Sequence, residues 1–207
     1  MALSPKAVLG DANVYTLLQH LVGAHLARKA CIEALEPRPG DHILDIGCGP
    51  AYYLDDLPAC DYYGFDTDTR YIAHARRRFG HRARFFDELY TEEHRVTLPP
   101  FEGVLLMGLL HHLDDAQCND LLALMGRSLV PGGRVVSLDT VLFDGQSRVS
   151  RFLARNDRGE FVRSPEAFRA LARRHFARVE SRLHGDTWRM PSAHFSMVLS
   201  EPIQAAP

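Results

Sequence analysis

Hydrophobic residues recur at helical spacing in the first part of the chain and then fall into short buried runs. From Asn13 to Leu35 they lie three or four positions apart, which predicts a long amphipathic helix, and the segment EPRPG at 36–40 ends it. Short apolar runs after this helix predict four strands: HILDIG from His42, YYGFD at 62–66, ARFF at 83–86 and VLLMGLL from Val104.

Helical patterns separate these strands along the chain. TRYIAHARRRF follows the second strand, and AQCNDLLALMGRSLV follows the fourth and is closed by Pro-Gly-Gly at 131–133. GRVVSLDTVL at 133–142 then predicts a fifth strand. Because parallel strands need crossover connections, the alternation predicts an α/β fold in which helices cover both faces of a mostly parallel sheet.

The pattern changes after residue 142. A polar, arginine-rich stretch at 143–163 comes first, and a helix follows it with Ser164 as N-cap and Pro165 at the first helical position. FARVESRL and SAHFSMVLSE alternate between apolar and polar residues, so we expect an antiparallel pair of strands at the sheet edge.

Composition narrows the class of protein without defining its activity. With 207 residues, of which 46% are hydrophobic, the chain is long enough for one core, and we expect a single domain over residues 1–207. The 24 basic and 26 acidic side chains nearly cancel, which disfavours nucleic acid and anionic membranes as partners. The four cysteines form no Cys-x-x-Cys pair, and no run reaches the roughly 18 apolar residues of a membrane span. These observations predict a cytoplasmic protein.

Two glycines directly after the first strand indicate a ligand-binding loop. Gly47 and Gly49 allow a ligand to approach the backbone closely, and we expect a helix to begin at Pro50. Asp66 ends the second strand 21 positions after Asp45, close to the roughly 20 expected of a carboxylate that binds ribose hydroxyls.

The same loop argues against a dinucleotide. Tyr52 occupies the position where the G-x-G-x-x-G pattern requires a third glycine, and Asp45 would repel a pyrophosphate. We therefore expect a cofactor that carries a ribose, no phosphate at this loop and a positive charge nearby. An NAD-dependent oxidoreductase remains an alternative that saturable NADH binding would support.

Four segments, in this order, resemble the motifs of class I S-adenosylmethionine-dependent methyltransferases: RPGDHILDIGCGP, YYGFDTDTRYIAHA, FEGVLLMGLLHHL and LVPGGRVVSLD. The resemblance covers roughly residues 38 to 200. It implies a Rossmann-like seven-stranded sheet in the order 3-2-1-4-5-7-6, with the last strand antiparallel. The long helix before the first strand predicts an N-terminal helical cap at 1–37.

The resemblance implies roles at the cofactor as well. Gly47 and Gly49 would line the methionine end of S-adenosylmethionine, Asp45 would orient its ammonium group, and Asp66 would bind both ribose hydroxyls. The remaining implied contacts are with the adenine and the methionine backbone, and they involve Thr67, Asp87, Met107 and Gly108. Ala51 replaces the family's third loop glycine, and Glu102 followed by Gly103 replaces its usual aspartate near the fourth strand.

Two adjacent histidines are the candidates for catalysis. His111 and His112 follow the fourth strand, at the edge where open α/β sheets bind ligands, and histidine titrates near neutrality. One of them could act as a general base; the alternative is a structural hydrogen bond to the neighbouring loop. The sequence has no metal-ligand pattern, so we expect metal-independent O- or N-methylation.

Recognition of the acceptor is expected from the first helix and from the segment at 143–163. Arg148, Arg151 and Arg155 would share one helical face and could bind a carboxylate or phosphate of the acceptor, although a run of charged residues is more often a solvated face. The other candidate substrate residues are Tyr15, Gln19, His20 and His194.

These features together predict a methyltransferase for a small-molecule acceptor, active as a monomer or homodimer. A nucleic-acid substrate is disfavoured by the absence of a basic surplus and of an Asn-Pro-Pro-Tyr-like motif after the fourth strand. Protein acceptors stay open. The alternative from another class is a module of the same fold that binds the cofactor or a partner without turnover.

Overall fold

A computed structural model of the chain describes residues 24–185 and 192–203. The predicted helix from Asn13 therefore lies partly outside the described residues, and its last part is α3, Ala24–Leu35. No helix in the described ranges is both long enough and apolar enough to cross a membrane.

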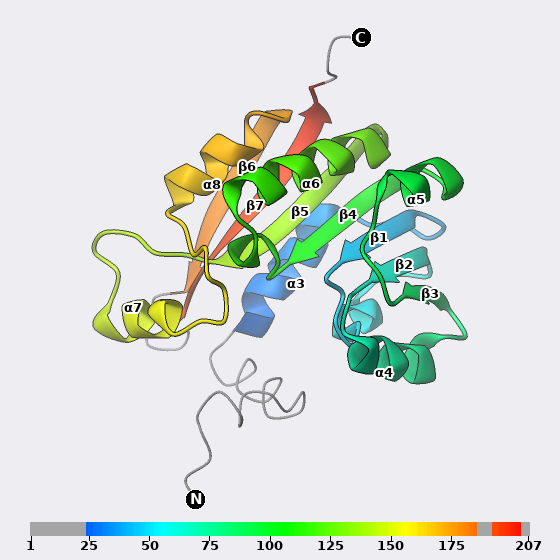
Figure 1. Ribbon diagram of the computed structural model, residues 1–207, viewed down its shortest axis with the longest axis horizontal. Coiled ribbons are helices and arrows are strands. Elements are labelled where there is room, and N and C mark those ends of the chain that lie inside the picture. The colour runs from blue at the N-terminus through cyan, green and yellow to red at the C-terminus, as the bar shows by residue number, and fades with distance from the viewer. Residues whose placement is uncertain (1–23, 186–191, 204–207) are drawn as a thin grey trace, which may run out of the picture.

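Seven strands form one sheet in the order β3-β2-β1-β4-β5-β7-β6 (Figure 1). Their bounds are β1 His42–Ile46, β2 Asp61–Phe65, β3 Ala83–Phe86, β4 Phe101–Met107, β5 Leu129–Thr140, β6 Phe176–Gly185 and β7 Ala193–Pro202. The first five strands pair in parallel, and β7 is antiparallel to both β5 and β6. The predicted order and the antiparallel final strand are confirmed.

Helices cover the two faces of the sheet. α3 and α4 pack on one face, whereas α6 and α8 pack on the other, and α7 lies on the side to which β4 points (Figure 1). The bounds of the remaining helices are η1 Tyr52–Asp56, α4 Thr69–Phe79, α5 Glu92–Thr97, η2 Leu110–His112, α6 Asp115–Ser128, α7 Arg148–Arg155 and α8 Pro165–Ala172.

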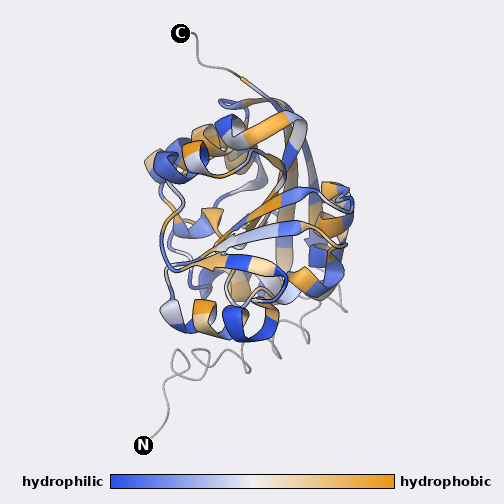
Figure 2. Ribbon diagram, turned by 90° about the vertical axis from the view of Figure 1, so that its right-hand side faces the viewer, coloured by the Kyte–Doolittle hydropathy of each residue, from blue (hydrophilic) through white to orange (hydrophobic). Residues whose placement is uncertain are grey.

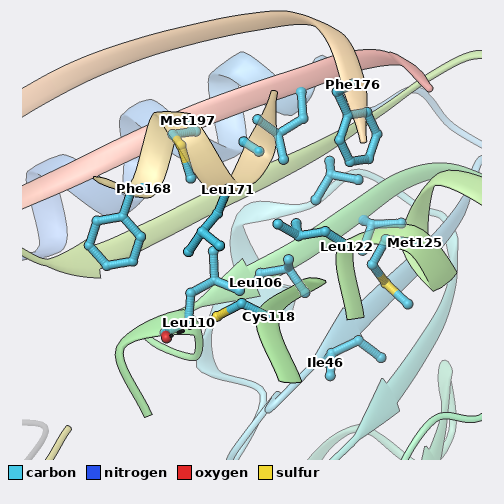
Figure 3. Close-up of a cluster of buried hydrophobic side chains, with 14 of the residues drawn as sticks. Ile46, Leu106, Leu110, Cys118, Leu122, Met125, Phe168, Leu171, Phe176 and Met197 are labelled. Atoms are coloured by element: carbon cyan, nitrogen blue, oxygen red, sulfur yellow. Dashed lines mark hydrogen bonds between the residues drawn. The ribbon is translucent and has the colours of Figure 1, made fainter. Parts of the chain in front are cut away.

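Each face of the sheet has its own hydrophobic core. Hydrophobic positions concentrate in the central strands, while the helices alternate between hydrophobic and hydrophilic positions (Figure 2). On one face, Cys118, Leu122 and Met125 of α6 belong to the same cluster of buried side chains as Phe168 and Leu171 of α8 (Figure 3). Burying such side chains contributes about 1.5–3 kcal/mol each, which holds the strand ends in fixed positions.

Two predicted boundaries are wrong. No α-helix begins at Pro50; Ala51 instead takes a left-handed conformation with φ of 58°, and a short 3₁₀-helix follows from Tyr52. The helix predicted to end at Pro-Gly-Gly already ends at Ser128, because residues 129–133 belong to β5. Phe101 pairs with Leu129 whereas Gly103 pairs with Arg134, so the Pro-Gly-Gly segment is absorbed as an irregularity in the strand.

Candidate active site

The loop after β1 takes a backbone conformation that favours glycine. Gly47 and Gly49 have φ of 71° and 53°, in the left-handed region that costs other residues about 1–2 kcal/mol. The amides of Gly47 and Cys48 both donate to the carbonyl oxygen of Phe65, at 2.8 and 3.1 Å. The loop is thus fixed to the end of β2.

Asp66 connects this loop to the start of α4. Its Oδ2 accepts from the amide of Gly49 at 2.9 Å, and its Oδ1 accepts from the amide of Asp68 at 2.8 Å. A carboxylate oxygen has two lone pairs, so each oxygen keeps acceptor capacity after one backbone bond. Asp66 lines the central cavity, where that capacity is available to a hydroxyl group.

Asp45 is a buried carboxyl beneath the loop. Its Oδ2 accepts from the hydroxyl of Tyr62 at 2.6 Å, and its Oδ1 has no hydrogen-bond partner among the described residues. Burial raises the pKa of Asp45 to about 7, against the opposing effect of the Tyr62 hydrogen bond. An ionised Asp45 would be stabilised by a cation close to the loop, since opposite charges favour the charged form.

A cavity of about 450 Å³ lies at the carboxyl ends of β1, β2, β4 and β5. Five of the predicted cofactor residues line it: Gly47, Gly49, Asp66, Met107 and Gly108. Residues that had no predicted role also line it, among them Arg28 of α3, Tyr71 of α4 and Thr140 of β5. The cavity sits where open α/β sheets bind their ligands.

Two residues predicted to contact the adenine are exposed and stand outside the lining of this cavity. Asp87 is partly exposed and forms an ion pair with Arg76 at 2.9 Å, which lowers the pKa of its carboxyl. Thr67 is exposed. Neither residue is among the described residues that line the cavity.

His111 is held between two carboxylates. Its Nδ1 lies 2.9 Å from Oδ1 of Asp139, at the end of β5, and its Nε2 lies 3.0 Å from Oδ1 of Asp157. Burial acts to lower the pKa of His111, but the two carboxylates outweigh it and raise the pKa to about 9. The ring is therefore protonated at neutral pH and clamped in one orientation.

His112 differs from its neighbour in exposure and in charge. Its side chain lines the cavity, and the centroid of its ring lies 4.2 Å from the ring centroid of His111. Burial and the charge of His111 both lower the pKa of His112. It is therefore neutral at neutral pH, with a ring nitrogen able to accept a proton.

Asp157 had no predicted role, although the predicted segment at 143–163 contains it. Oδ2 of Asp157 accepts from the hydroxyl of Thr140 at 3.2 Å, and the amide of Phe161 donates to the carbonyl of His111 at 2.9 Å. The guanidinium of Arg163 donates to the carbonyls of Leu110 and Leu113 at 2.9 and 2.7 Å. The segment thereby closes around η2, the turn that carries both histidines.

The predicted substrate residues are divided among several places. His194 of β7 lines the cavity, and burial lowers its pKa to about 4. Arg148, Arg151 and Arg155 lie on α7, but none of them is among the described residues of this cavity. Tyr15, Gln19 and His20 lie outside the described residues.

Three side chains at the cavity could together hold a metal ion, which the sequence had not indicated. Ligand atoms of His111, His112 and Asp157 lie within 4.8 Å of one another. The proton that His111 keeps between two carboxylates competes with a metal for its Nε2, because histidine binds metals as the neutral ring.

The strand order and the site together correspond to one class of protein. A family model described as a methyltransferase domain matches residues 43–133, from β1 into β5. This match and the strand order confirm the predicted resemblance to class I S-adenosylmethionine-dependent methyltransferases.

Particular proteins are similar to this chain over most of its length. A Streptomyces fradiae relative, described as an uncharacterized 37.1 kDa protein in transposon TN4556, is 33% identical over 183 residues, which cover 81% of this chain and 51% of the relative. This chain thus spans about half the length of that relative.

Among solved structures, N-methyltransferase NodS from Bradyrhizobium japonicum in complex with S-adenosyl-L-homocysteine has a TM-score of 0.70, 16% identity and 96% coverage of both chains. Human N-acetylserotonin methyltransferase in complex with S-adenosylmethionine has a TM-score of 0.63, 16% identity, and coverage of 95% of this chain and 58% of that chain. An O-methyltransferase family protein from Burkholderia thailandensis has a TM-score of 0.64, 14% identity, and coverage of 97% of this chain and 64% of that chain. At these identities the likeness is one of fold.

Proposed function

We propose that this chain binds S-adenosylmethionine in the central cavity and transfers its methyl group to an oxygen or nitrogen of a small-molecule acceptor, without a metal. The observation that carries this proposal is the convergence of Gly47, Gly49 and Asp66 on one cavity beside the buried carboxyl of Asp45. The free acceptor capacity of Asp66 suits ribose hydroxyls, and the unpartnered Oδ1 of Asp45 suits a nearby ammonium.

When bound, the cofactor supplies an electrophilic methyl group on a sulfonium. The residues of the chain then have to align the acceptor and exclude water. Gly47, Gly49, Met107 and Gly108 would offer close backbone approach along the cavity wall. The adenine contacts of Thr67 and Asp87 stay predictions, as does the anionic character of the acceptor.

Of the two candidate catalytic histidines, we assign proton removal from the acceptor to His112. A general base has to be neutral before it acts, and the lowered pKa of His112 meets that condition, whereas the raised pKa of His111 does not. We assign His111 the role of a positioning residue, because its two ion pairs fix η2 and its charge adds to the effect of burial in lowering the pKa of His112.

Titration calorimetry with S-adenosylmethionine and S-adenosylhomocysteine tests the cofactor site. We expect micromolar binding of both ligands and a loss of about 10- to 150-fold in Asp66→Asn, since a hydrogen bond to a charged group contributes about 1.5–3 kcal/mol. Asp56→Asn, which changes an exposed acid of η1, is the matched control and should bind like the wild type. The proposal fails if neither ligand binds, or if both variants behave alike.

Turnover separates an enzyme from a binding module of the same fold. A panel of hydroxyl- and amine-bearing metabolites, incubated with S-adenosylmethionine labelled in its methyl group, should yield a labelled product. His112→Ala should lower the rate about 10²- to 10⁴-fold, the usual contribution of a general base. Binding of both cofactor forms without any labelled product would favour the module.

A further inference from the structure

A second and larger concavity lies outside the site described above. It measures about 900 Å³ and is bounded by α7, α8, the strands β6 and β7, and the segment after β5. Both helices lie toward the end of the sheet that β6 and β7 form (Figure 1). We call it the arginine groove, because Arg151, Arg155 and Arg169 all line it.

Two of these arginines are available to a ligand. Among the described residues, Arg155 has no hydrogen-bond or ion-pair partner, and the guanidinium of Arg151 makes one long bond, at 3.4 Å, to the carbonyl of Phe143. Arg169 is paired with Glu166 at 3.3 Å, and Asp144 is the second acid of the groove. Arg151 and Arg155 have no carboxylate partner among the described residues and are four positions apart on α7, a spacing that places them on one helix face and suits an anionic ligand.

The remaining walls of the groove are apolar. Phe143, Leu183 and Phe195 line it, and the guanidinium of Arg169 lies 5.2 Å from the ring centroid of Phe195. Leu183 is 43% exposed on β6, although it is large and hydrophobic. A ligand that matches these walls has an apolar body in addition to its anionic head.

The arginine groove shares two elements with the methyl-transfer cavity. On α7, Ser150 and Ala154 line the central cavity, whereas Arg151 and Arg155 line the groove. On β7, Ala193 and His194 line the central cavity, whereas Phe195 lines the groove. A ligand in the groove would therefore rest on the same helix that closes the active site.

We propose that the arginine groove is a second binding site, separate from the cofactor site, for a small organic anion with an apolar body, whose carboxylate or phosphate is bound by Arg151 and Arg155. S-adenosylmethionine is not the ligand of this site, because the residues that we propose to hold it line the central cavity instead. It accounts for the arginine face that the sequence displays on α7.

Calorimetry with three probes of one shape tests the proposal: 2-naphthoate, 2-naphthyl phosphate and the neutral 2-naphthamide. We expect at least one anion to bind with a stoichiometry of one and the amide to bind at least tenfold more weakly. The stronger of the two anions identifies the head group. Binding should persist with S-adenosylhomocysteine at saturation, and it does not depend on turnover, so a failure of the proposed methyl transfer would not affect the result.

Variants locate the binding. The double variant Arg151→Gln with Arg155→Gln should lower the affinity for the anion at least tenfold. Arg148→Gln, on the same helix but outside the described lining of the groove, should leave that affinity within twofold of the wild type. Leu183→Glu, at an exposed strand position, places a carboxylate in the groove and should weaken binding without disturbing the core. Equal binding of the amide and the anions, displacement by S-adenosylhomocysteine, or an equal loss in Arg148→Gln would each overturn the proposal.

Discussion

Replacing Asp157 by asparagine should release His111 from one of its two carboxylates. In the native protein the pKa of His111 lies at about 9, above the ordinary 6.5, because both ring nitrogens meet carboxylates. A histidine with a raised pKa stabilises the folded state fully below pH 6.5, and this contribution is lost as the pH rises through about 9. The rise in pKa corresponds to about 3 kcal/mol of stability.

The wild-type free energy of unfolding should therefore fall by about 3 kcal/mol between pH 6 and pH 9.5. In Asp157→Asn, the Nδ1 contact with Asp139 remains, so we expect a loss of roughly 1–2 kcal/mol at pH 6 and a flatter decline toward high pH. Urea denaturation at the two pH values measures both quantities.

Histidine NMR measures the pKa of His111 directly. The Cε1–H resonance of His111, assigned with His111→Gln, should titrate near pH 9 in the wild type and at lower pH in Asp157→Asn. Asp144→Asn removes an exposed acid from the same segment and is the matched control. A wild-type His111 that titrates near 6.5, or one that Asp157→Asn leaves unchanged, would refute the carboxylate clamp.

Three further outcomes are expected. The pKa of Asp45 is about 7, so its carboxyl is mostly protonated at pH 6, and binding of the cationic S-adenosylmethionine should release that proton. Calorimetry in buffers of different ionisation enthalpy should show this release as a buffer-dependent binding enthalpy. The dependence should disappear in Asp45→Asn. A Cβ at Gly159 would collide with the ring and carbonyl of His111, so Gly159→Ala should lower the free energy of unfolding by about 1–3 kcal/mol in urea denaturation and shift the His111 resonance. Gly145→Ala also strains the backbone, because Gly145 has φ of 83°, but no atom of the described residues lies near its added Cβ, so it should leave that resonance in place. Incubation with EDTA should leave turnover unchanged, and a loss that a single divalent ion restores would instead place a metal at His111, His112 and Asp157.

The sheet was predictable because its signals are local. The first four strands are short apolar runs, the last two alternate between apolar and polar residues, and the glycine loop and Asp66 lie at strand ends that the pattern already defines. The α-helix expected at Pro50 does not form there because Ala51 takes a left-handed conformation with φ of 58°, which a right-handed helix cannot include, and a 3₁₀-helix over Tyr52–Asp56 follows. The short helix α5, Glu92–Thr97, buries none of its residues and so has little apolar pattern to predict it.

The partners of His111 were missed for a different reason. Asp139 lies 28 positions away and meets His111 through the pairing of β4 with β5, in which Met107 is opposite Leu138. An acid at the end of the strand next to the histidines was therefore a usable signal once the strand order was expected. Asp157 offered no such signal, because its position depends on how an irregular segment folds back over η2.

The place of β7 between β5 and β6 has a consequence for the order in which the molecule assembles. β6 is synthesised first, but its only strand partner in the described sheet is β7, so it has nothing to pair with until residues 193–202 have emerged from the ribosome. The same strand brings Ala193 and His194 to the cavity wall. Closure of the sheet and completion of the cavity thus coincide in one late event, and a nascent chain that lacks β7 has an open edge at β5 and an unfinished cavity.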